Sequence, residues 1–259
     1  MQSPARALAI FCISVLLFGC AAQPIAKRDP RDPFDRVNRA TYRFNDGFDK
    51  AIARPVAKTY VTVTPRFVRT GVSNFVDNLT YPVTIVNDLL QAKFIQTCAD
   101  TGRLLLNSTV GIGGLLDPAS DAGLQKNDED FGQTLGRWGV KPGPYVVLPF
   151  LGFSDVRDTV GKIADIYTHP THYIDNSTVS WSLWGVEVLD TRARLLSADN
   201  VVDTAYDPYT FTKNAYLQRR QYLVTDGEIE DQPPPDDPGA DDAPQSPDTQ
   251  PPGAPAPTK

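Results

Sequence analysis

The spacing of apolar residues predicts a mainly α-helical chain. In several segments apolar side chains recur every three or four residues, which is the repeat of one helix face. The first such stripe runs from Phe34 to Ile52, and Pro55 is expected to end its helix. Later stripes run over residues 68–79, 83–90, 94–105, 156–167, 181–195 and 211–222. Alternation of apolar and polar residues, which is typical of strands, is scarce.

Residues that can cap a helix precede several of these stripes. An Asp–Pro or Thr–Pro pair suits a helix start. The Asp or Thr side chain can accept hydrogen bonds from the free backbone N–H groups, and proline fits the first helical position. Such pairs begin at Asp32, Thr64, Asp117 and Asp207, and Ser154 is a further candidate cap. We therefore expect helices to begin at these positions.

The acidic run from Asn127 to Asp130 precedes a helix-like segment from Phe131 to Trp138. Carboxylates before a helix start interact favourably with the helix dipole, so we expect this run to cap the helix. A calcium site would need oxygen ligands at alternating positions and a later bidentate glutamate, which is absent.

Two segments rich in glycine or proline interrupt the helical pattern. Residues 108–116 are apolar and glycine-rich, which favours close helix–helix approach over a phosphate-binding loop. Residues 139–153 are more apolar still and contain three prolines. We expect an apolar Pro/Gly-rich loop there, which must be buried against the body or face a nonpolar phase such as lipid.

Four glycines recur at short intervals around the start of the second segment: Gly132, Gly136, Gly139 and Gly143. On a helix, glycines four residues apart let another backbone approach closely. Two interpretations stay open, compact packing in water and a segment that lies at a bilayer. The apolar stretch that follows favours the second.

The first twenty residues are typical of a lipoprotein signal peptide. Arg6 precedes an apolar run, residues 7–18, which is too short to span a bilayer. Residues 17–20, Leu-Phe-Gly-Cys, resemble a lipobox, so we expect cleavage of residues 1–19, acylation of Cys20 and a lipidated tether over 20–31. Ala21 is not the aspartate that retains lipoproteins at the inner membrane, which favours the outer membrane. The alternative is an ordinary signal segment that happens to contain a cysteine.

Charge is distributed unevenly along the chain. Its 259 residues carry a net charge of -6, but nine carboxylates, one lysine and ten of the 23 prolines lie between Asp226 and Lys259. Such a segment has little to bury, so we expect residues 227–259 to form a disordered acidic tail. The remaining 225 residues carry 24 basic and 22 acidic groups, or +2, so the domain, 32–226, is not a strongly basic nucleic-acid binder.

Motifs for catalysis or metal binding are missing from the sequence. There is no G-x-S-x-G, P-loop or H-E-x-x-H, so we expect neither an enzyme nor a cofactor. His169 and His172 could bind a metal with nearby aspartates, but Pro170 between them disfavours a helical pair. Cys98 is expected to be a buried small hydrophobe rather than a reactive thiol.

Long ordered motifs make the chain similar to the MlaA (VacJ-like) family of outer-membrane lipoproteins. The matching segments are residues 32–34, 38–39, 44–45, 69–75, 86–87, 100–103, 107–114, 129–139, 143–149 and 207–209, together with Pro82. The segment 129–139, Glu-Asp-Phe-Gly-Gln-Thr-Leu-Gly-Arg-Trp-Gly, is the most specific. Departures are small: residues 35–37 differ from the expected pattern, and the tail is longer than in most members.

The resemblance implies a ring-like bundle of amphipathic helices at a membrane, which encloses an amphipathic channel. Such proteins remove mislocalised phospholipid from the outer leaflet of the outer membrane and thereby maintain lipid asymmetry. They pass it to a soluble periplasmic lipid-carrier protein, and they commonly associate with trimeric porins. No cofactor is implied.

The resemblance also implies candidate channel or gating residues. Phe44 and Asn45 match a place in the family's first helix where the state of the channel is set; alternatively they are a core phenylalanine and a local cap. The other candidates are Gly132, Gly136, Trp138, Gly143, Pro144 and Tyr145.

Two other functions are alternatives to lipid transport. A structural or adhesion lipoprotein would bind porin or cell wall through the acidic tail, so its function would be lost with residues 228–259. A lipid hydrolase would produce lyso-lipids, but the missing nucleophile motif counts against it.

Overall fold

The computed structural model describes residues 29–228. The signal peptide, Cys20 and residues 229–259 of the acidic tail lie outside these residues. As the apolar spacing predicts, the described part is mainly helical. Its elements are α2 (Asp35–Phe48), η2 (Asp49–Ala53), α3 (Arg54–Val63), α4 (Arg66–Leu90), α5 (Phe94–Thr109), α6 (Pro118–Asp121), α7 (Phe131–Arg137), β1 (Tyr145–Leu148), β2 (Gly152–Asp155), α8 (Val156–Ile166), η3 (Pro170–Tyr173), α9 (Ser177–Arg194), η4 (Leu195–Ala198), α10 (Asp199–Asp203) and α11 (Pro208–Val224).

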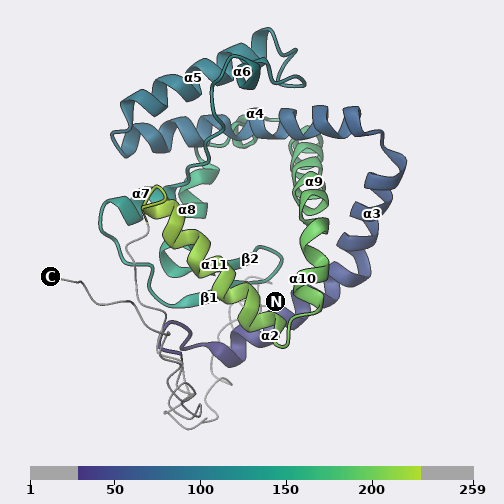
Figure 1. The fold of residues 1–259 in the computed structure, drawn as a ribbon, viewed down its shortest axis with the longest axis vertical. Coiled ribbons are helices and arrows are strands. Elements are labelled where there is room, and N and C mark those ends of the chain that lie inside the picture. Colours follow the sequence, from purple (N-terminus) through teal and green to yellow (C-terminus); the bar gives the residue numbers. More distant parts are fainter. Residues whose placement is uncertain (1–28, 229–259) are drawn as a thin grey trace, which may run out of the picture. The chain divides into compact units, whose positions relative to one another are not determined.

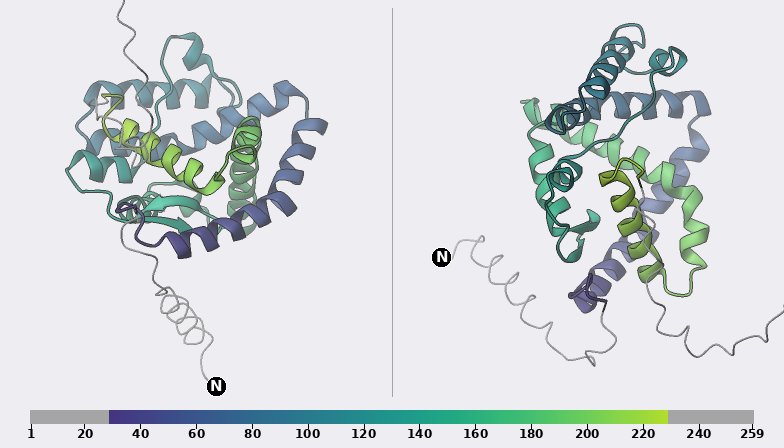
Figure 2. Two further views of the ribbon diagram at one scale, coloured as in Figure 1. Left: turned by 60° about the horizontal axis from the view of Figure 1, so that its bottom comes forward. Right: turned by 60° about the vertical axis from the view of Figure 1, so that its left-hand side comes forward.

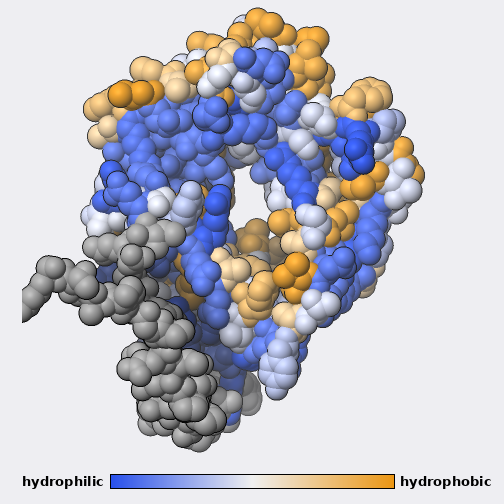
Figure 3. Space-filling model, viewed as in Figure 1, coloured by the Kyte–Doolittle hydropathy of each residue, from blue (hydrophilic) through white to orange (hydrophobic). Residues whose placement is uncertain are grey.

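The elements of residues 29–228 surround a central opening. Figure 1 shows α2 along the bottom, α3 on the right-hand side, α4 across the top, and α9 and α11 facing each other on either side of the gap. The opening persists when every atom is drawn, so side chains do not fill it (Figure 3). The described part is therefore a ring of helices.

Pro55 does not end the first helix, contrary to expectation. α2 continues through the π-helical turn η2 into α3, with helical backbone angles at both junctions. Pro55 occupies the first turn of α3, and the change of hydrogen-bond register in η2 accommodates its missing N–H. The helical path ends only at Thr64, whose extended backbone is the conformation favoured before Pro65.

Pro82 likewise lies inside a helix. The stripes 68–79 and 83–90, expected as two helices, form the single helix α4 of 25 residues. An interior proline costs about 3 kcal/mol in an isolated helix. Tyr81, Val83 and Thr84 beside it are buried, and this packing offsets the cost.

The apolar segment 139–153 was expected to be a loop, but it contains most of a β hairpin. β1 and β2 pair antiparallel, with Tyr145 opposite Asp155 and Leu148 opposite Gly152. The hairpin packs against α2 and α11 (Figure 2). Tyr145 and Val147 enter a small core with Tyr209 of α11. The sequence suggested either burial or exposure, and the segment has both, because its tip at Phe150 is 65% exposed.

Helix caps follow the prediction at some positions only. Asp117, Asp130 and Asp207 cap α6, α7 and α11, each accepting from a backbone N–H three residues on. Asp32 does not cap α2, because its buried carboxylate accepts from Tyr209 and Lys213 of α11 instead.

Two other predicted caps were wrong. Thr64 ends α3 and caps nothing. Ser154 is buried within β2, and the next residue, Asp155, caps α8 by accepting from the Asp158 N–H.

Burial in this molecule is inverted relative to a water-soluble globule. Among residues 29–228, 17 polar or charged side chains are buried but only eight hydrophobic ones, so the apolar stripes do not form a central core. Figure 3 shows apolar side chains along the outer rim over α5, α6 and the turn between them, and polar ones around the upper and left margins of the opening. An exposed apolar surface of this extent is typical of contact with a membrane or a partner.

Helix α5 shows this inversion clearly. Cys98, expected to be buried, is exposed, because the whole apolar stripe of α5 faces outward. Ile95 on the same helix is 89% exposed. Despite this apolar exterior, none of the helices in the described part is both long and apolar enough to span a bilayer.

The glycine-rich turn after α5 lies against α4, as its composition predicts. A Cβ on Gly114 would come within 2.5 Å of the Asn78 Cβ, and the backbone of Gly114 has a positive φ of +91°. Only glycine meets both requirements at this position. The turn thus fixes the distance between α5 and α4.

Candidate functional site

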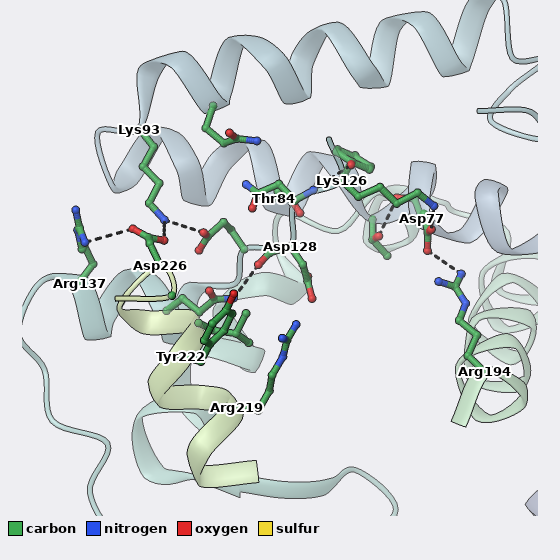
Figure 4. A pocket seen from close by; sticks show the side chains of 18 residues that line it. Asp77, Thr84, Lys93, Lys126, Asp128, Arg137, Arg194, Arg219, Tyr222 and Asp226 are labelled. Carbon is green, nitrogen blue, oxygen red and sulfur yellow. Dashed lines mark hydrogen bonds and ion pairs between the residues drawn. The ribbon is translucent and has the colours of Figure 1, made fainter. Parts of the chain in front are cut away.

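A polar cavity of about 840 Å³ lies between α4 and α11. Figure 4 shows side chains from α4, α5, α7, α9 and α11 pointing into it. Nine of the lining residues carry charge: Asp77, Lys93, Lys126, Asp128, Glu129, Arg137, Arg194, Arg219 and Asp226. Three of the contributing helices, α4, α9 and α11, also border the central opening in Figure 1. The cavity therefore places a concentrated set of charges in a molecule that also exposes many large apolar side chains.

One end of the cavity is closed by a network around Lys93. Its ammonium donates to Glu129 at 2.7 Å and to Asp226, and Asp226 also pairs with Arg137 at 3.3 Å. Burial raises the pKa of Glu129, although the hydrogen bond from Lys93 opposes the rise. Burial by itself would lower the pKa of Lys93, but its bonds to Asp226 and Glu129 outweigh that effect, so its pKa is raised. These charges neutralise one another.

The opposite end is held by Asp77 of α4. Its carboxylate pairs with Lys126 at 2.9 Å and with Arg194 of α9 at 2.7 Å. Arg194 also pairs with the buried Asp190 at 2.6 Å. This network joins α4 to the adjacent helix α9, and the charges at this end of the cavity are paired with one another.

Two charges in the middle of the cavity have no ion-pair partner among residues 29–228. Arg219 projects from α11 and Asp128 from the segment before α7 (Figure 4). Arg219 lies beside the ring of Tyr222, with its guanidinium carbon 5.7 Å from the ring centre. The cavity thus offers one cation and one anion for contact with a ligand.

The acidic run before α7 does more than cap a helix. Asp130 caps α7, as predicted, and also accepts two hydrogen bonds from Arg220 of α11, at 2.6 and 2.9 Å. Asn127 donates to both Asp88 and Asp100, each at 3.1 Å. Asn127 and Asp130 are thereby held in place, and the side chain of Asp128 between them faces the cavity. Asn127, Glu129 and Asp130 are thus bound by side chains elsewhere in the fold, whereas the Asp128 carboxylate faces the cavity.

Beneath Asn127 lies a pair of fully buried carboxyls, Asp88 and Asp100. Burial raises the pKa of Asp88, and the hydrogen bond and negative charge of Asp100 raise it further. The pKa of Asp88 is thereby raised to about 8, so this carboxyl holds its proton at neutral pH. Because Asp88 is protonated, Asn127 can donate hydrogen bonds to both carboxyl groups without two buried negative charges lying side by side.

The predicted channel residues lie outside this cavity. Asn45 of α2 binds the tip of the hairpin: its side-chain N–H donates to the Leu148 carbonyl and its oxygen accepts from the Phe150 N–H, both at 2.9 Å. Phe44 is neither buried nor a core residue, and its ring packs edge-on against Phe150 at 5.1 Å. These two residues connect α2 to the exposed tip of the hairpin.

Of the predicted glycines, two lie at helix crossings. A Cβ on Gly161 of α8 would come within 2.4 Å of the Gly132 nitrogen, so α7 and α8 are in close backbone contact there. Gly136 similarly leaves room for Val224 and Arg157. Compact packing accounts for both positions. Gly143, by contrast, is in a turn with a φ of +71°.

The other predicted residues hold the hairpin and its approaches. Trp138 donates its ring N–H to the Leu90 carbonyl at 3.1 Å and is itself exposed. The Pro144 carbonyl accepts from the Val156 N–H, which joins the hairpin to α8. Tyr145 is fully buried in the small core. A role of these residues in gating stays a prediction.

No metal centre is apparent in the part of the chain that the structure describes. Residues 29–228 contain no group of three His, Cys, Asp or Glu side chains arranged to hold a metal ion. His169 bonds to Thr171 and lies 3.7 Å from Glu187, whereas His172 packs between two tyrosines. The two histidines do not converge.

No pattern in the sequence predicts the cavity, and least of all its two central charges, Arg219 and Asp128. Arg219 and Asp128 are separated by 90 residues of sequence, and no local motif links them. The neighbouring residues Arg219 and Arg220 gave a partial indication of the site. Successive residues on a helix point about 100° apart, so these two arginines cannot bind the same partner. The fold and the cavity together define a class of protein, a helical ring with many exposed apolar side chains and a charged cavity.

The chain belongs to the MlaA lipoprotein family. The family model described as MlaA lipoprotein matches residues 30–223, nearly all of the described part. The intermembrane phospholipid transport system lipoprotein MlaA of Escherichia coli is 37% identical over 227 residues, which cover 85% of this chain and 88% of the relative. The protein of the same name from Haemophilus influenzae is 29% identical over 222 residues, with 83% and 89% covered.

A solved structure supports the same assignment. It is described as the structural basis for maintenance of bacterial outer membrane lipid asymmetry, and it superimposes with a TM-score of 0.68 at 36% identity. The match covers 76% of this chain and all of the solved chain. The ring is therefore the fold of a known family.

Proposed function

We propose that this chain is a non-enzymatic lipoprotein that removes mislocalised phospholipid from the outer leaflet of the outer membrane and passes it to a periplasmic carrier. Maintenance of lipid asymmetry would be the result. Its relatives in E. coli and H. influenzae are named as lipoproteins of an intermembrane phospholipid transport system. The inverted burial is the single observation in the molecule that carries the proposal.

A phospholipid has two parts that need opposite surroundings. Moving its polar headgroup through a nonpolar phase without compensating contacts costs several kcal/mol, roughly 2–7 for a single amide or hydroxyl group. The polar interior offers a path on which the headgroup keeps hydrogen-bonding partners. The apolar exterior suits contact with acyl chains, so the ring could rest at membrane depth without a spanning helix.

Attachment and place in the cell follow from the proposed acylation of Cys20. One acyl chain binds a membrane only marginally, whereas two or more anchor it stably. A triacylated Cys20 would hold the ring at the periplasmic face of the outer membrane. Residues 20–31 would then be a short tether between the anchor and the ring.

The partners proposed are a soluble periplasmic lipid carrier and a trimeric porin. The carrier is required because a phospholipid cannot cross the aqueous periplasm unaided. Photo-crosslinkers at exposed hairpin positions such as Phe150 and Leu151 should capture phospholipid and porin in the same cells. Phe44 and Asn45 are proposed to set the channel state through this same hairpin tip.

The test is a clean deletion of the gene. Phospholipid should accumulate in the outer leaflet, with sensitivity to detergent plus chelator, and a plasmid copy should restore the wild-type distribution. The recovered lipid should be intact rather than lyso-lipid. A deletion strain with an unchanged leaflet distribution would contradict the proposal.

A truncation separates this function from a purely structural one. A chain ending at Gly227 keeps every residue that lines the cavity. Transport should largely survive in it. Complete loss of function on removing residues 228–259 would instead favour a tail-mediated adhesion role.

A further inference from the structure

The cavity contains seven charges that are satisfied by one another and two that are not. Lys93, Arg137, Glu129 and Asp226 are paired at one end, and Lys126, Arg194 and Asp77 at the other. Within residues 29–228, only Arg219 and Asp128 among the charged lining residues lack an ion-pair partner. An unpaired charge on a cavity wall is the natural contact for a charged ligand.

The two charges lie within electrostatic reach of each other without bonding. Partial burial raises the pKa of Asp128, nearby Asp130 raises it further, and the positive charge of Arg219 opposes the rise. In Figure 4 both side chains face the same open volume between α4 and α11. A ligand between them would meet a guanidinium on one side and a carboxylate on the other.

Neighbouring contacts hold both side chains in place. Arg220, the next residue of α11, is bound by Asp130, so α11 is fixed in rotation and Arg219 is directed into the cavity. Asn127 is bound by Asp88 and Asp100, which fixes the backbone that carries Asp128. Bonded neighbours therefore fix the backbone at both unpaired charges before any ligand arrives, which lowers the entropy cost of binding.

We propose that Arg219 and Asp128 form a headgroup site for zwitterionic phospholipid, in which Arg219 binds the phosphodiester and Asp128 binds the ammonium group. A guanidinium suits the phosphate oxygens, since its fork of N–H donors can bind two of them at once. The carboxylate is acceptor-only when ionised and suits an alkylammonium. This inference rests on the proposed transport function and adds to it a preference for one class of lipid headgroup.

The arrangement distinguishes two classes of phospholipid. A lipid with phosphate and amine, such as phosphatidylethanolamine, satisfies both residues. Phosphatidylglycerol offers the phosphate alone and leaves Asp128 without a cation. Losing one charge-assisted hydrogen bond corresponds to a preference of about tenfold.

The experiment is a competition on the full-length acylated protein. Phosphatidylethanolamine and phosphatidylglycerol with identical acyl chains are supplied in equal amounts, and the bound lipids are counted by native mass spectrometry. The wild type should favour phosphatidylethanolamine by about tenfold. Asp128→Asn should reduce the ratio to near one, whereas Arg219→Gln should lower the binding of both lipids by about tenfold.

Matched controls separate the site from general effects of charge. Asp121→Asn and Arg43→Gln remove one charge each from exposed residues that do not line the cavity, and neither should change the ratio or the amount bound. Asp128→Glu keeps the carboxylate and should retain the preference. Circular dichroism of each variant checks that the helices are intact.

Soluble glycerophosphoethanolamine distinguishes a lipid site from one for a free phosphoamine. It should bind at least tenfold more weakly than the lipid, because it lacks acyl chains that contact apolar surface. Equal affinity would overturn the assignment to lipid. The site itself is wrong if Asp128→Asn leaves the lipid ratio unchanged.

Failure of the site differs from failure of the proposed function. Suppose that the wild-type protein restores leaflet asymmetry in a deletion strain, but Asp128→Asn and Arg219→Gln bind lipid as the wild type does. This result would overturn only the headgroup site. A wild-type protein that does not restore asymmetry would overturn the transport function as well.

Discussion

Two asparagines of α2 hold the β hairpin, and their replacement by alanine should have unequal costs. Asn38 and Asn45 are seven residues apart, about two helical turns, so both amides face β1. Asn38 accepts from the Val147 N–H at 2.9 Å and donates to the Tyr145 carbonyl at 3.0 Å. It also donates to the buried Asp32 at 2.8 Å. Asn45 makes the equivalent two bonds at the hairpin tip.

The two substitutions should differ in their cost in unfolding free energy because water reaches the Asn45 site but not the Asn38 site. All three partners of Asn38 are buried, so Asn38→Ala leaves polar groups unsatisfied and should cost about 3–4 kcal/mol. At the other site Phe150 is exposed, so water can replace the lost bonds, and Asn45→Ala should cost about 1 kcal/mol. The loosened tip should nevertheless be more mobile in Asn45→Ala.

Urea unfolding of the full-length protein in detergent, followed by far-ultraviolet circular dichroism, measures both costs. Asn200→Ala is the matched control, because this exposed side chain makes no hydrogen bond within residues 29–228, and its change should stay within about 0.5 kcal/mol. Equal costs for the two hairpin variants would refute the reasoning, and so would a loss below about 1 kcal/mol for Asn38→Ala.

Three further predictions concern packing, pH and anchoring. Gly161→Ala should destabilise the fold by about 1–3 kcal/mol in urea unfolding, because its Cβ would come within 2.4 Å of the Gly132 nitrogen, whereas Gly185→Ala, with open space around it, should not. Burial raises the pKa of Asp165 from 3.8 to about 6, so the folded state holds this proton more tightly than the unfolded chain. The free energy of unfolding should therefore fall as pH rises from about 4 to about 6, and a pH series of melts on Asp165→Asn should lack that part of the fall. Cys20→Ala should accumulate a precursor that takes up no labelled fatty acid; labelling at wild-type level would exclude acylation at this residue.

The helices could be predicted from the sequence because their signals are local. The apolar repeat located the helices α2, α4, α5, α8, α9 and α11 but neither α3 nor α10, and Asp117, Asp130 and Asp207 cap the helices that follow them. Proline was misleading twice, since Pro55 and Pro82 were expected to interrupt helices but lie inside continuous helical paths. Their cost is offset by the π turn and by buried neighbours, which are properties of the tertiary structure.

The direction of each helix face could not be predicted from the repeat. A stripe such as that of Ile95 and Cys98 shows that one side of α5 is apolar, but not which phase covers it. In a water-soluble protein the stripe would face a core, whereas here it faces outward. The distinction depends on the surroundings of the whole ring, and composition alone does not encode it.

The cavity was unpredictable for a different reason. Arg219 and Asp128 meet only after α4, α7 and α11 are packed, and neither residue stands out in its own segment. The acidic run around Asp128 was expected only to cap a helix, and its second role depends on Asn127 being held by two distant carboxyls. Family resemblance highlighted the glycines and the hairpin, which shape the ring, rather than the charges that face its interior.

The central claim is that phospholipid headgroups enter the polar interior of the ring. Site-specific photo-crosslinking in intact cells tests it most directly, with the probe at Thr80, which lines the cavity, and at Ile95, which is 89% exposed on the apolar exterior. We predict phospholipid adducts from both positions, with the Thr80 adduct reduced by Arg219→Gln and the Ile95 adduct unaffected. Adducts from Ile95 alone, with none from Thr80, would contradict passage through the interior.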